Sequence, residues 1–260
     1  LPHILGPMDK SLTAQMQKSL EKLGLKFHLE TKLLSAKVEG DKVLAECERK
    51  GEKLSLEGDR LLVTVGRRAN SQNLGLENLN IKTDELGRIE VNDKFETSCP
   101  KVYAIGDVIK GPMLAHKAEE EGVALAELLV KNYGHVNYGL VPSVVYTWPE
   151  VASVGLTEQE CQQKNLKVKI GQFAFKANGR AHAVGQTDGF VKIIADQRTD
   201  KVLGVHILGA TASEMIAEAC IAMEYGASSE DIARTMHAHP TLSEAVKEAA
   251  LACDKRALHS

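Results

Sequence analysis

The sequence predicts an α/β protein in which parts of doubly wound domains precede an α+β unit. The helix-then-strand order of residues 9–29 is typical of half a doubly wound unit. Two apolar segments, 60–65 and 101–107, each finish near a glycine and a charged residue, as strands do at the carboxyl edge of an open α/β sheet. From residue 138 onward the pattern changes to short strands joined by tight turns and separated by short helices.

The composition is that of a globular protein and excludes several functions. With 260 residues the chain is long for one domain, so we expect two or three units. A net charge of −3, without any Lys/Arg cluster, argues against nucleic-acid binding. No apolar run approaches membrane-spanning length, and the first residues lack a secretory layout. The cysteines are odd in number and scattered, which fits a reducing compartment and suggests neither a disulfide framework nor a zinc site.

The first segment is expected to contain a helix, a strand and then short hairpins. Asp9 is suited to cap the helix, and Gly24 to end it. A strand is predicted at 25–29. Turn sequences around Gly40 and Gly51 then predict hairpins, before the apolar strand 60–65, which we expect to be buried. The apolar stripe of the helix consists of Leu12, Met16, Leu20 and Leu23.

Two glycine-containing strand ends are candidate ligand sites. Gly66 follows the strand 60–65, where it would let the backbone approach a ligand; a simple turn is the alternative. Asp107 lies at the tip of the strand 101–107 and is placed to accept hydrogen bonds from sugar hydroxyls, the alternative being an exposed turn. A long helix to residue 131 follows, with Glu119-Glu120-Glu121 expected to be solvated.

The last part is predicted to be an α+β unit after a linker at 132–138. A capping box at Thr157–Glu160 predicts a short helix, and a longer helix is expected at 212–225, ended by Gly226. Ser229 is expected to cap a further short helix. The expected strands are 142–146, 151–154, 168–175, 190–195 and 202–208.

The octapeptide 237–244, His-Ala-His-Pro-Thr-Leu-Ser-Glu, concentrates the chemistry. Pro240 holds His239 on a stiff corner, through a bond that could be cis. Glu244 can reach back to one imidazole nitrogen, which fixes the tautomer and leaves the other nitrogen to exchange protons. In the alternative, Thr241 and Glu244 form a capping box and His239 is an ordinary loop histidine. Spacing alone leaves both open.

His239-Pro240-Thr241 with Glu244 resembles the C-terminal signature of the flavin-dependent disulfide reductases. The longer string, from Ala238 to Ala245, is most similar to the branch that oxidises dihydrolipoamide with NAD. The resemblance implies FAD and NAD as cofactors, with His239 as the catalytic base and Glu244 orienting it. It also implies that Gly66 lies beside the nicotinamide dinucleotide. The implied flavin contacts are Asp107, at the ribityl chain, and Met113, Leu114, Ala115 and His116 at a helix N-terminus.

The same resemblance implies three domains and a homodimer. Residues 1–69 would end an NAD-binding domain, 70–137 would be the second segment of an FAD-binding domain, and 138–260 would be an interface domain with an antiparallel sheet. In such a dimer, the His–Glu pair of one subunit completes the active site of the other. The implied partners are lipoyl domains and the subunit-binding domain of 2-oxo acid dehydrogenase complexes. The implied location is cytoplasmic in bacteria or the mitochondrial matrix in eukaryotes.

Two family features are missing from the sequence. No Gly-x-Gly-x-x-Gly follows a strand, and no Cys-x-x-x-x-Cys redox pair occurs. We therefore expect the C-terminal part of such an enzyme, unable by itself to bind FAD tightly or to turn over. Another flavin disulfide reductase, similar to glutathione reductase, or a truncated, non-catalytic dimerisation or docking module remain the alternatives.

Overall fold

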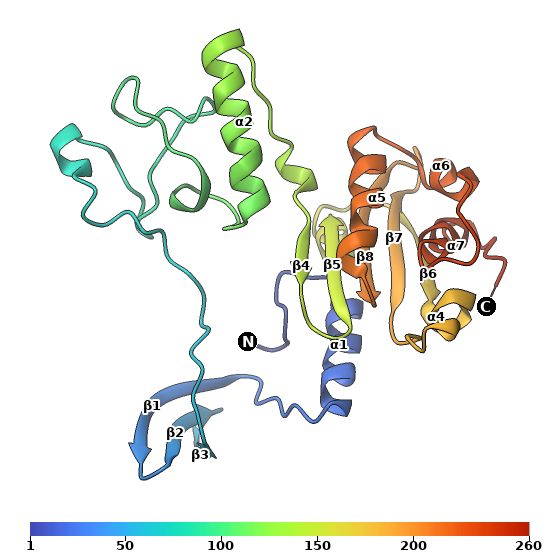
Figure 1. Ribbon diagram of the computed structural model, residues 1–260, viewed down its shortest axis with the longest axis horizontal. Coiled ribbons are helices and arrows are strands. Elements are labelled where there is room, and N and C mark those ends of the chain that lie inside the picture. The colour runs from blue at the N-terminus through green and yellow to red at the C-terminus, as the bar shows by residue number, and fades with distance from the viewer. Residues whose placement is uncertain (260) are drawn as a thin grey trace. The chain divides into compact units, whose positions relative to one another are not determined.

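The computed structural model describes residues 1–259, and the chain forms two compact units (Figure 1). One unit comprises Leu1–Arg60 together with the chain from Gly139 onward, and the other comprises Leu61–Tyr138. Among the described residues, no helix is long and apolar enough to cross a membrane.

The first unit is built on a five-stranded antiparallel sheet. Its order is β4-β5-β8-β7-β6, so the strand that follows β7 in the chain lies between β7 and β5. These strands confirm the predicted ones to within a few residues at their ends. They are β4 (Ser143–Val145), β5 (Glu150–Gly155), β6 (Val168–Ala174), β7 (Phe190–Asp196) and β8 (Val202–Gly209).

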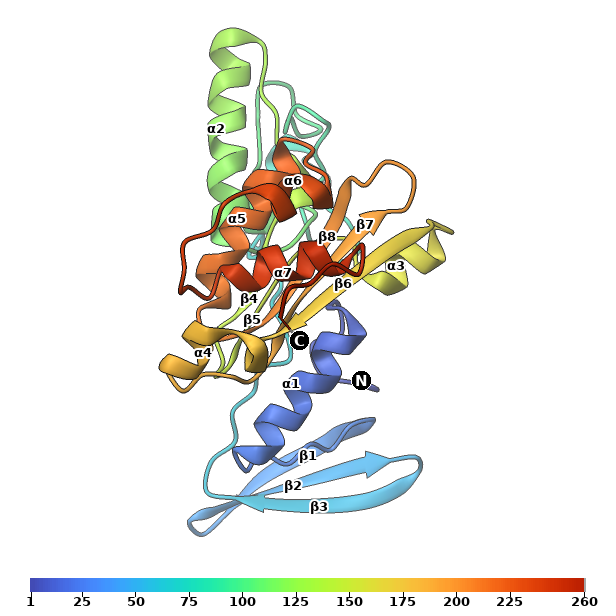
Figure 2. The same ribbon diagram turned by 90° about the vertical axis from the view of Figure 1, so that its right-hand side faces the viewer.

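Helices cover both faces of this sheet. Alternate strand residues such as Ala152, Ile193 and Ile207 pack in one core with α5 (Ala212–Glu224), α6 (Ser229–Arg234) and α7 (Glu244–Ala252). Figure 2 shows α5 and α7 lying against the strands. The opposite face contributes Val151, Phe190 and Leu208 to a second core, closed by Leu12 and Met16 of α1 (Lys10–Lys22). Both faces are therefore buried, which explains why β7 is apolar apart from Lys192 and its last residue, Asp196.

Two smaller helices complete this unit. The predicted capping box is confirmed at α3 (Glu158–Gln163), where Thr157 and Glu160 each accept the other's backbone N–H. The helix α4 (Gly179–Ala183) was not predicted from sequence; Asn178 caps it by accepting from the N–H of Ala181.

A buried ion network joins α1 to the sheet. Lys192 of β7 donates to both carboxylate oxygens of Asp9, at 2.9 and 3.1 Å, and to Glu158 at 2.7 Å. Burial works to raise the pKa of Asp9, but hydrogen bonds from Ser11, from the backbone of Glu158 and from Lys192 outweigh it and lower this pKa to about 2. The predicted N-cap role of Asp9 is confirmed by its bond to the N–H of Ser11.

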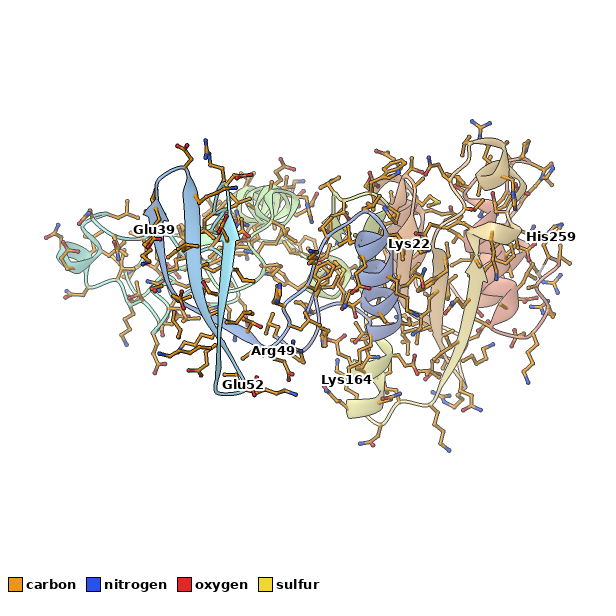
Figure 3. The ribbon with its side chains drawn as sticks, turned by 90° about the horizontal axis from the view of Figure 1, so that it is seen from below. Lys22, Glu39, Arg49, Glu52, Lys164 and His259 are labelled. Atoms are coloured by element: carbon orange, nitrogen blue, oxygen red, sulfur yellow. The ribbon has the colours of Figure 1, made fainter. Side chains whose placement is uncertain are left out.

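The hairpins predicted after residue 30 form a three-stranded antiparallel meander, drawn from below in Figure 3. It consists of β1 (Thr31–Glu39), β2 (Lys42–Arg49) and β3 (Glu52–Gly58). Gly40 and Gly51 take positive φ values of 60° and 85° in the two turns, as the sequence predicts.

The predicted strands 25–29 and 60–65 are wrong: both segments are irregular. Leu62, Val63 and Val65 are 83%, 63% and 91% exposed instead of buried. A strand needs a neighbour to satisfy its backbone groups, and within residues 1–259 no other strand pairs with either segment. Apolar composition alone therefore did not determine their conformation.

The second unit contains one long helix, α2 (Ala115–Lys131), which confirms the predicted one. The strand predicted at 101–107 is reduced to an isolated bridge between Glu96 and Tyr103, followed by the 3₁₀ turn η2 (Gly106–Val108). A small apolar core still forms around this segment. Its buried members are Ile81, Ile89, Phe95, Ala104, Ile109 and Ala124.

Candidate functional site

His239 and Glu244 form a hydrogen-bonded pair at the start of α7. Nδ1 of His239 lies 2.8 Å from Oε1 of Glu244, and the other carboxylate oxygen accepts the backbone N–H of Thr241 at 2.8 Å. One carboxylate therefore holds both the imidazole and the Thr241 backbone. The predicted capping box does not form, because the Thr241 hydroxyl donates to the carbonyl of Ala238 and the N-cap of α7 is Ser243. The peptide bond between His239 and Pro240 is cis.

The electrostatics of this pair suit proton exchange. Burial works to raise the pKa of Glu244, but the N–H of Thr241 and the ring of His239 lower it below its ordinary value, so the carboxylate is ionised at neutral pH. The His239 side chain is 77% exposed, whereas that of Glu244 is 23% exposed. Because Glu244 engages Nδ1, Nε2 is the nitrogen left to exchange a proton.

A cavity of about 220 Å³ lies beside the pair. Asn178 forms part of its wall and donates from Nδ2 to the carbonyl of Thr241 at 3.0 Å, which ties α4 to the histidine loop. A second imidazole–carboxylate pair lines the same cavity: Nδ1 of His259 is 2.8 Å from Oε1 of Glu248. Glu248 is one helical turn after Glu244, so both carboxylates lie on the same side of α7.

His237 has a different environment from His239. Its Nε2 lies 2.6 Å from Glu218 of α5, its Nδ1 lies 2.9 Å from the carbonyl of Thr235, and its side chain is buried. The hydrogen bond with Glu218 raises the pKa of His237. This histidine anchors the loop, a role that the sequence did not reveal because the partner carboxylate lies nineteen positions away.

The predicted flavin contacts lie in the second unit. Asp107 is exposed beside Gly106 and accepts from Nη1 of Arg67 at 3.1 Å. Helix α2 begins at Ala115, and no side chain caps its N-terminus at Leu114. Ala115 and His116 are exposed, and Met113 and Leu114 are half-buried. An exposed carboxylate and an uncapped helix N-terminus are the groups that a ribityl chain and a reduced isoalloxazine require, so these residues fit FAD.

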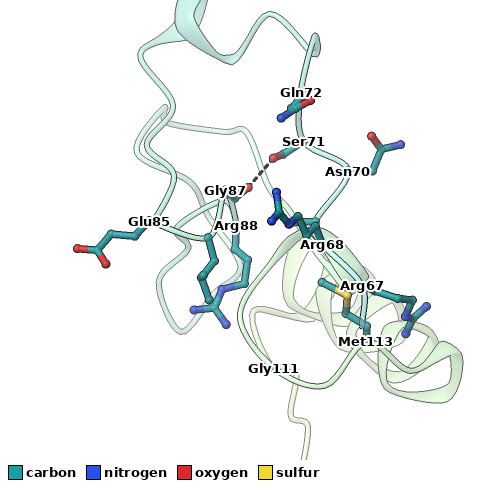
Figure 4. A pocket seen from close by; sticks show the side chains of 12 residues that line it. Arg67, Arg68, Asn70, Ser71, Gln72, Glu85, Gly87, Arg88, Gly111 and Met113 are labelled. Carbon is teal, nitrogen blue, oxygen red and sulfur yellow. Dashed lines mark hydrogen bonds between the residues drawn. The ribbon is translucent and has the colours of Figure 1, made fainter. Parts of the chain in front are cut away.

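Gly66 belongs to the same unit and has a φ of 116°, with open space where a side chain would be. The residues after it, Arg67 and Arg68, line a cavity of about 910 Å³, shown in Figure 4. Met113 and Arg88 lie in the same wall. The structure thus brings the neighbours of Gly66 together with Asp107 and Met113, whereas His239 and Glu244 belong to the other unit.

One expectation for α2 is contradicted. The sequence predicts that Glu121 is solvated with its acidic neighbours, but its side chain is fully buried. It pairs with Lys117, which is also buried and which the sequence did not single out. The sequence did contain a hint of this ion pair, because a lysine and a glutamate four positions apart on a helix can contact each other. Such pairs are usually exposed, however.

Comparison with known proteins identifies relatives for both parts of the chain. The model of the family described as "Pyridine nucleotide-disulphide oxidoreductase" matches residues 1–122, and that of its dimerisation domain matches 141–250. The mitochondrial dihydrolipoyl dehydrogenase of Dictyostelium discoideum is 53% identical over 98% of this chain and 53% of its own length. The one of Pisum sativum is 52% identical over 98% and 52%. A leghemoglobin reductase of Glycine max is 53% identical over 96% and 48%.

Solved structures share the fold. LpdA from Mycobacterium tuberculosis superposes with a TM-score of 0.85 at 25% identity, over 93% of this chain and 52% of that one. The HOCl-induced flavoprotein disulfide reductase RclA from Escherichia coli superposes with a TM-score of 0.86 at 22% identity, over 95% and 56%. The chain spans about half the length of the curated relatives it matches.

Proposed function

The chain belongs to the pyridine nucleotide-disulphide oxidoreductase family, and from this membership we propose that it is the C-terminal part of a dihydrolipoamide dehydrogenase. FAD and NAD are the cofactors of this family. The matched family models and the LpdA superposition confirm the predicted fold class. The reaction proposed is the oxidation of dihydrolipoamide to lipoamide, with electrons passing through a redox disulfide and FAD to NAD.

The observation that carries this proposal is the His239–Glu244 pair. An exposed imidazole, held through Nδ1 by an ionised carboxylate, can take a proton from a dithiol at Nε2. The carboxylate then stabilises the imidazolium that forms. The thiolate left by this transfer is the species that attacks a disulfide by thiol exchange.

Residues of the second unit are proposed to hold the cofactors. Asp107 would accept hydrogen bonds from the ribityl hydroxyls, and the N-terminus of α2, with Met113, Leu114, Ala115 and His116, would face the isoalloxazine. Gly66 would lie beside the nicotinamide dinucleotide, where its lack of a side chain leaves space. When bound, FAD supplies two-electron redox chemistry and hydride transfer to NAD.

The dimerisation domain matched at 141–250 indicates a homodimer. We propose that the domain boundaries are 1–69, 70–137 and 138–260, and that His239 and Glu244 of one subunit complete the site of the other. Lipoyl domains and the subunit-binding domain of 2-oxo acid dehydrogenase complexes are the proposed partners. The mitochondrial matrix is the proposed location in a eukaryote, as the names of two relatives indicate, and the cytoplasm in a bacterium.

The proposal is tested by assaying the complete enzyme that would contain this chain. NAD-dependent oxidation of dihydrolipoamide, with little reduction of glutathione disulfide, is the expected result. The opposite preference would favour the second candidate, another flavin disulfide reductase. We further propose that these 260 residues alone neither bind FAD tightly nor turn over, because they contain neither glycine fingerprint nor redox cysteine pair. A flavin-containing preparation of the isolated chain would contradict this.

A further inference from the structure

Lys117 and Glu121 of α2 form an ion pair that has no exposed side-chain surface. Nζ lies 3.0 Å from Oε1, and both side chains are 0% exposed. Removing two charges from water is costly, and the mutual attraction of a pair offsets this cost only when every remaining hydrogen-bonding group is also satisfied. The other partners of this pair therefore show what it holds in place.

The backbone of Gly106 is the main partner. Its N–H donates to Oε2 of Glu121 at 2.6 Å, and its carbonyl accepts from Nζ of Lys117 at 3.0 Å. Both polar groups of one residue are thus held by a single ion pair. Gly106 has a φ of 76°, and a side chain there would lie 3.2 Å from the Cβ of Ala118, so the segment also packs closely on the helix.

A third side chain completes the network. The hydroxyl of Tyr138 donates to Oε1 of Glu121 at 2.8 Å. Burial and the adjacent carboxylate raise the pKa of Tyr138, so the phenol remains a donor. The stem of Lys117 meanwhile fills the space beside Gly111, where a side chain would approach its Cε to 3.1 Å. The network therefore fixes the segment 106–111 on the first turns of α2.

Asp107 directly follows the residue that is held in this way. Because Lys117 binds the carbonyl of Gly106, the backbone next to Asp107 is held against α2. The first residue of this helix is two positions before Lys117. The two features that fit a flavin, an exposed carboxylate and an uncapped helix end, are thereby fixed relative to one another. An apolar pair of similar volume would pack as well, but it could not bind both backbone groups of Gly106.

We propose that Lys117 and Glu121 are positioning residues that set the flavin affinity by holding Gly106 and Asp107 in the binding conformation. The proposal rests on the proposed function, since it requires that Asp107 contacts FAD. A purely folding role is the competing explanation. It would lower stability without any dependence on Asp107.

The test is a double-substitution cycle, measured by FAD titration of the apo form of the complete enzyme. Lys117→Met removes the ammonium and keeps a stem beside Gly111, and Asp107→Ala removes the carboxylate. Each single substitution is expected to raise the Kd for FAD about tenfold or more, the scale of one lost hydrogen bond to a charged group. If Lys117 acts through Asp107, adding Lys117→Met to Asp107→Ala changes the Kd by less than about threefold.

Glu120→Gln, at the exposed neighbour of Glu121, is the matched control and should leave the Kd unchanged. Tyr138→Phe removes only one hydroxyl and replaces Lys117→Met in the test if that variant does not fold. It should also raise the Kd for FAD. An unchanged Kd in Tyr138→Phe or Lys117→Met, or fully additive effects in the cycle, would overturn the positioning role. Wild-type enzyme that binds no FAD would instead overturn the proposed function.

Discussion

Replacing Glu244 by glutamine should impair the candidate base through its tautomer. In the wild type one carboxylate oxygen accepts from Thr241 and the other faces Nδ1 of His239. If the amide oxygen keeps the bond to Thr241, the amide N–H₂ faces Nδ1 and favours the ring that carries its proton on Nε2. That ring cannot accept a proton at Nε2. If the amide flips, its N–H₂ group faces the N–H of Thr241. Two donors then meet, and the backbone of Thr241 loses its hydrogen bond.

The expected loss is that of one hydrogen bond to a charged group, about 1.5–3 kcal/mol, or roughly 10- to 100-fold in kcat. The assay is steady-state oxidation of dihydrolipoamide by the complete enzyme, with thermal unfolding measured in parallel. Glu120→Gln, at an exposed carboxylate with no role in the pair, is the control for the loss of one negative charge. An unchanged kcat in a normally folded Glu244→Gln enzyme would refute the reasoning, because the reaction would then not depend on the contact with Nδ1.

Three further predictions concern stability. The pKa of Asp9 is lowered from 3.8 to about 2, so its stabilisation is present above pH 3.8 and is lost as the pH falls towards 2. The free energy of unfolding should therefore fall by about 2 kcal/mol over this range, and Asp9→Asn should abolish this pH dependence. The pKa of His237 is raised by Glu218, so its contribution is complete below pH 6.5 and is lost as the pH rises through the folded-state pKa; Glu218→Gln should flatten this dependence in chemical unfolding curves. Gly189→Ala would place Cβ 1.9 Å from the carbonyl of Leu208 at a φ of 102°, and should lower the free energy of unfolding by more than about 2 kcal/mol, whereas Gly179→Ala, in open space, should change it little.

The sequence predicts the interface sheet well because its elements carry local signals. β7 and β8 are mainly apolar, the capping residues Thr157 and Asp9 are found where expected, and Gly226 follows the end of α5 with a positive φ. What the apolar stripe of α1 packs against could not be predicted. A stripe identifies a buried face but not its partner.

The two wrongly predicted strands, 25–29 and 60–65, share one physical cause. Residues 60–65 have the composition of a buried strand, but a strand forms through pairing with other strands, and pairing is not encoded in the segment itself. The prediction that Glu121 is solvated was wrong for a related reason. The helical pattern places it among acidic neighbours, and only the folded chain brings it to the backbone of Gly106.

The candidate site was predictable where its parts are adjacent in sequence. The five-residue spacing of His239 and Glu244 predicts their contact, which the structure shows at 2.8 Å. The difference between the two histidines of the motif was not predictable, since it depends on Glu218 from another helix. The link from Asn178 to Thr241 is equally long-range.

The most direct test of the central claim is single-turnover reduction of the flavin by dihydrolipoamide in His239→Ala complete enzyme. Loss of a positioned base should slow this reduction by about 10²–10⁴-fold, while the bound FAD content stays that of the wild type. His135→Ala, at an exposed histidine of the other unit, should reduce the flavin at the wild-type rate. Reduction at the wild-type rate in His239→Ala would show that this imidazole does not accept the proton of the dithiol.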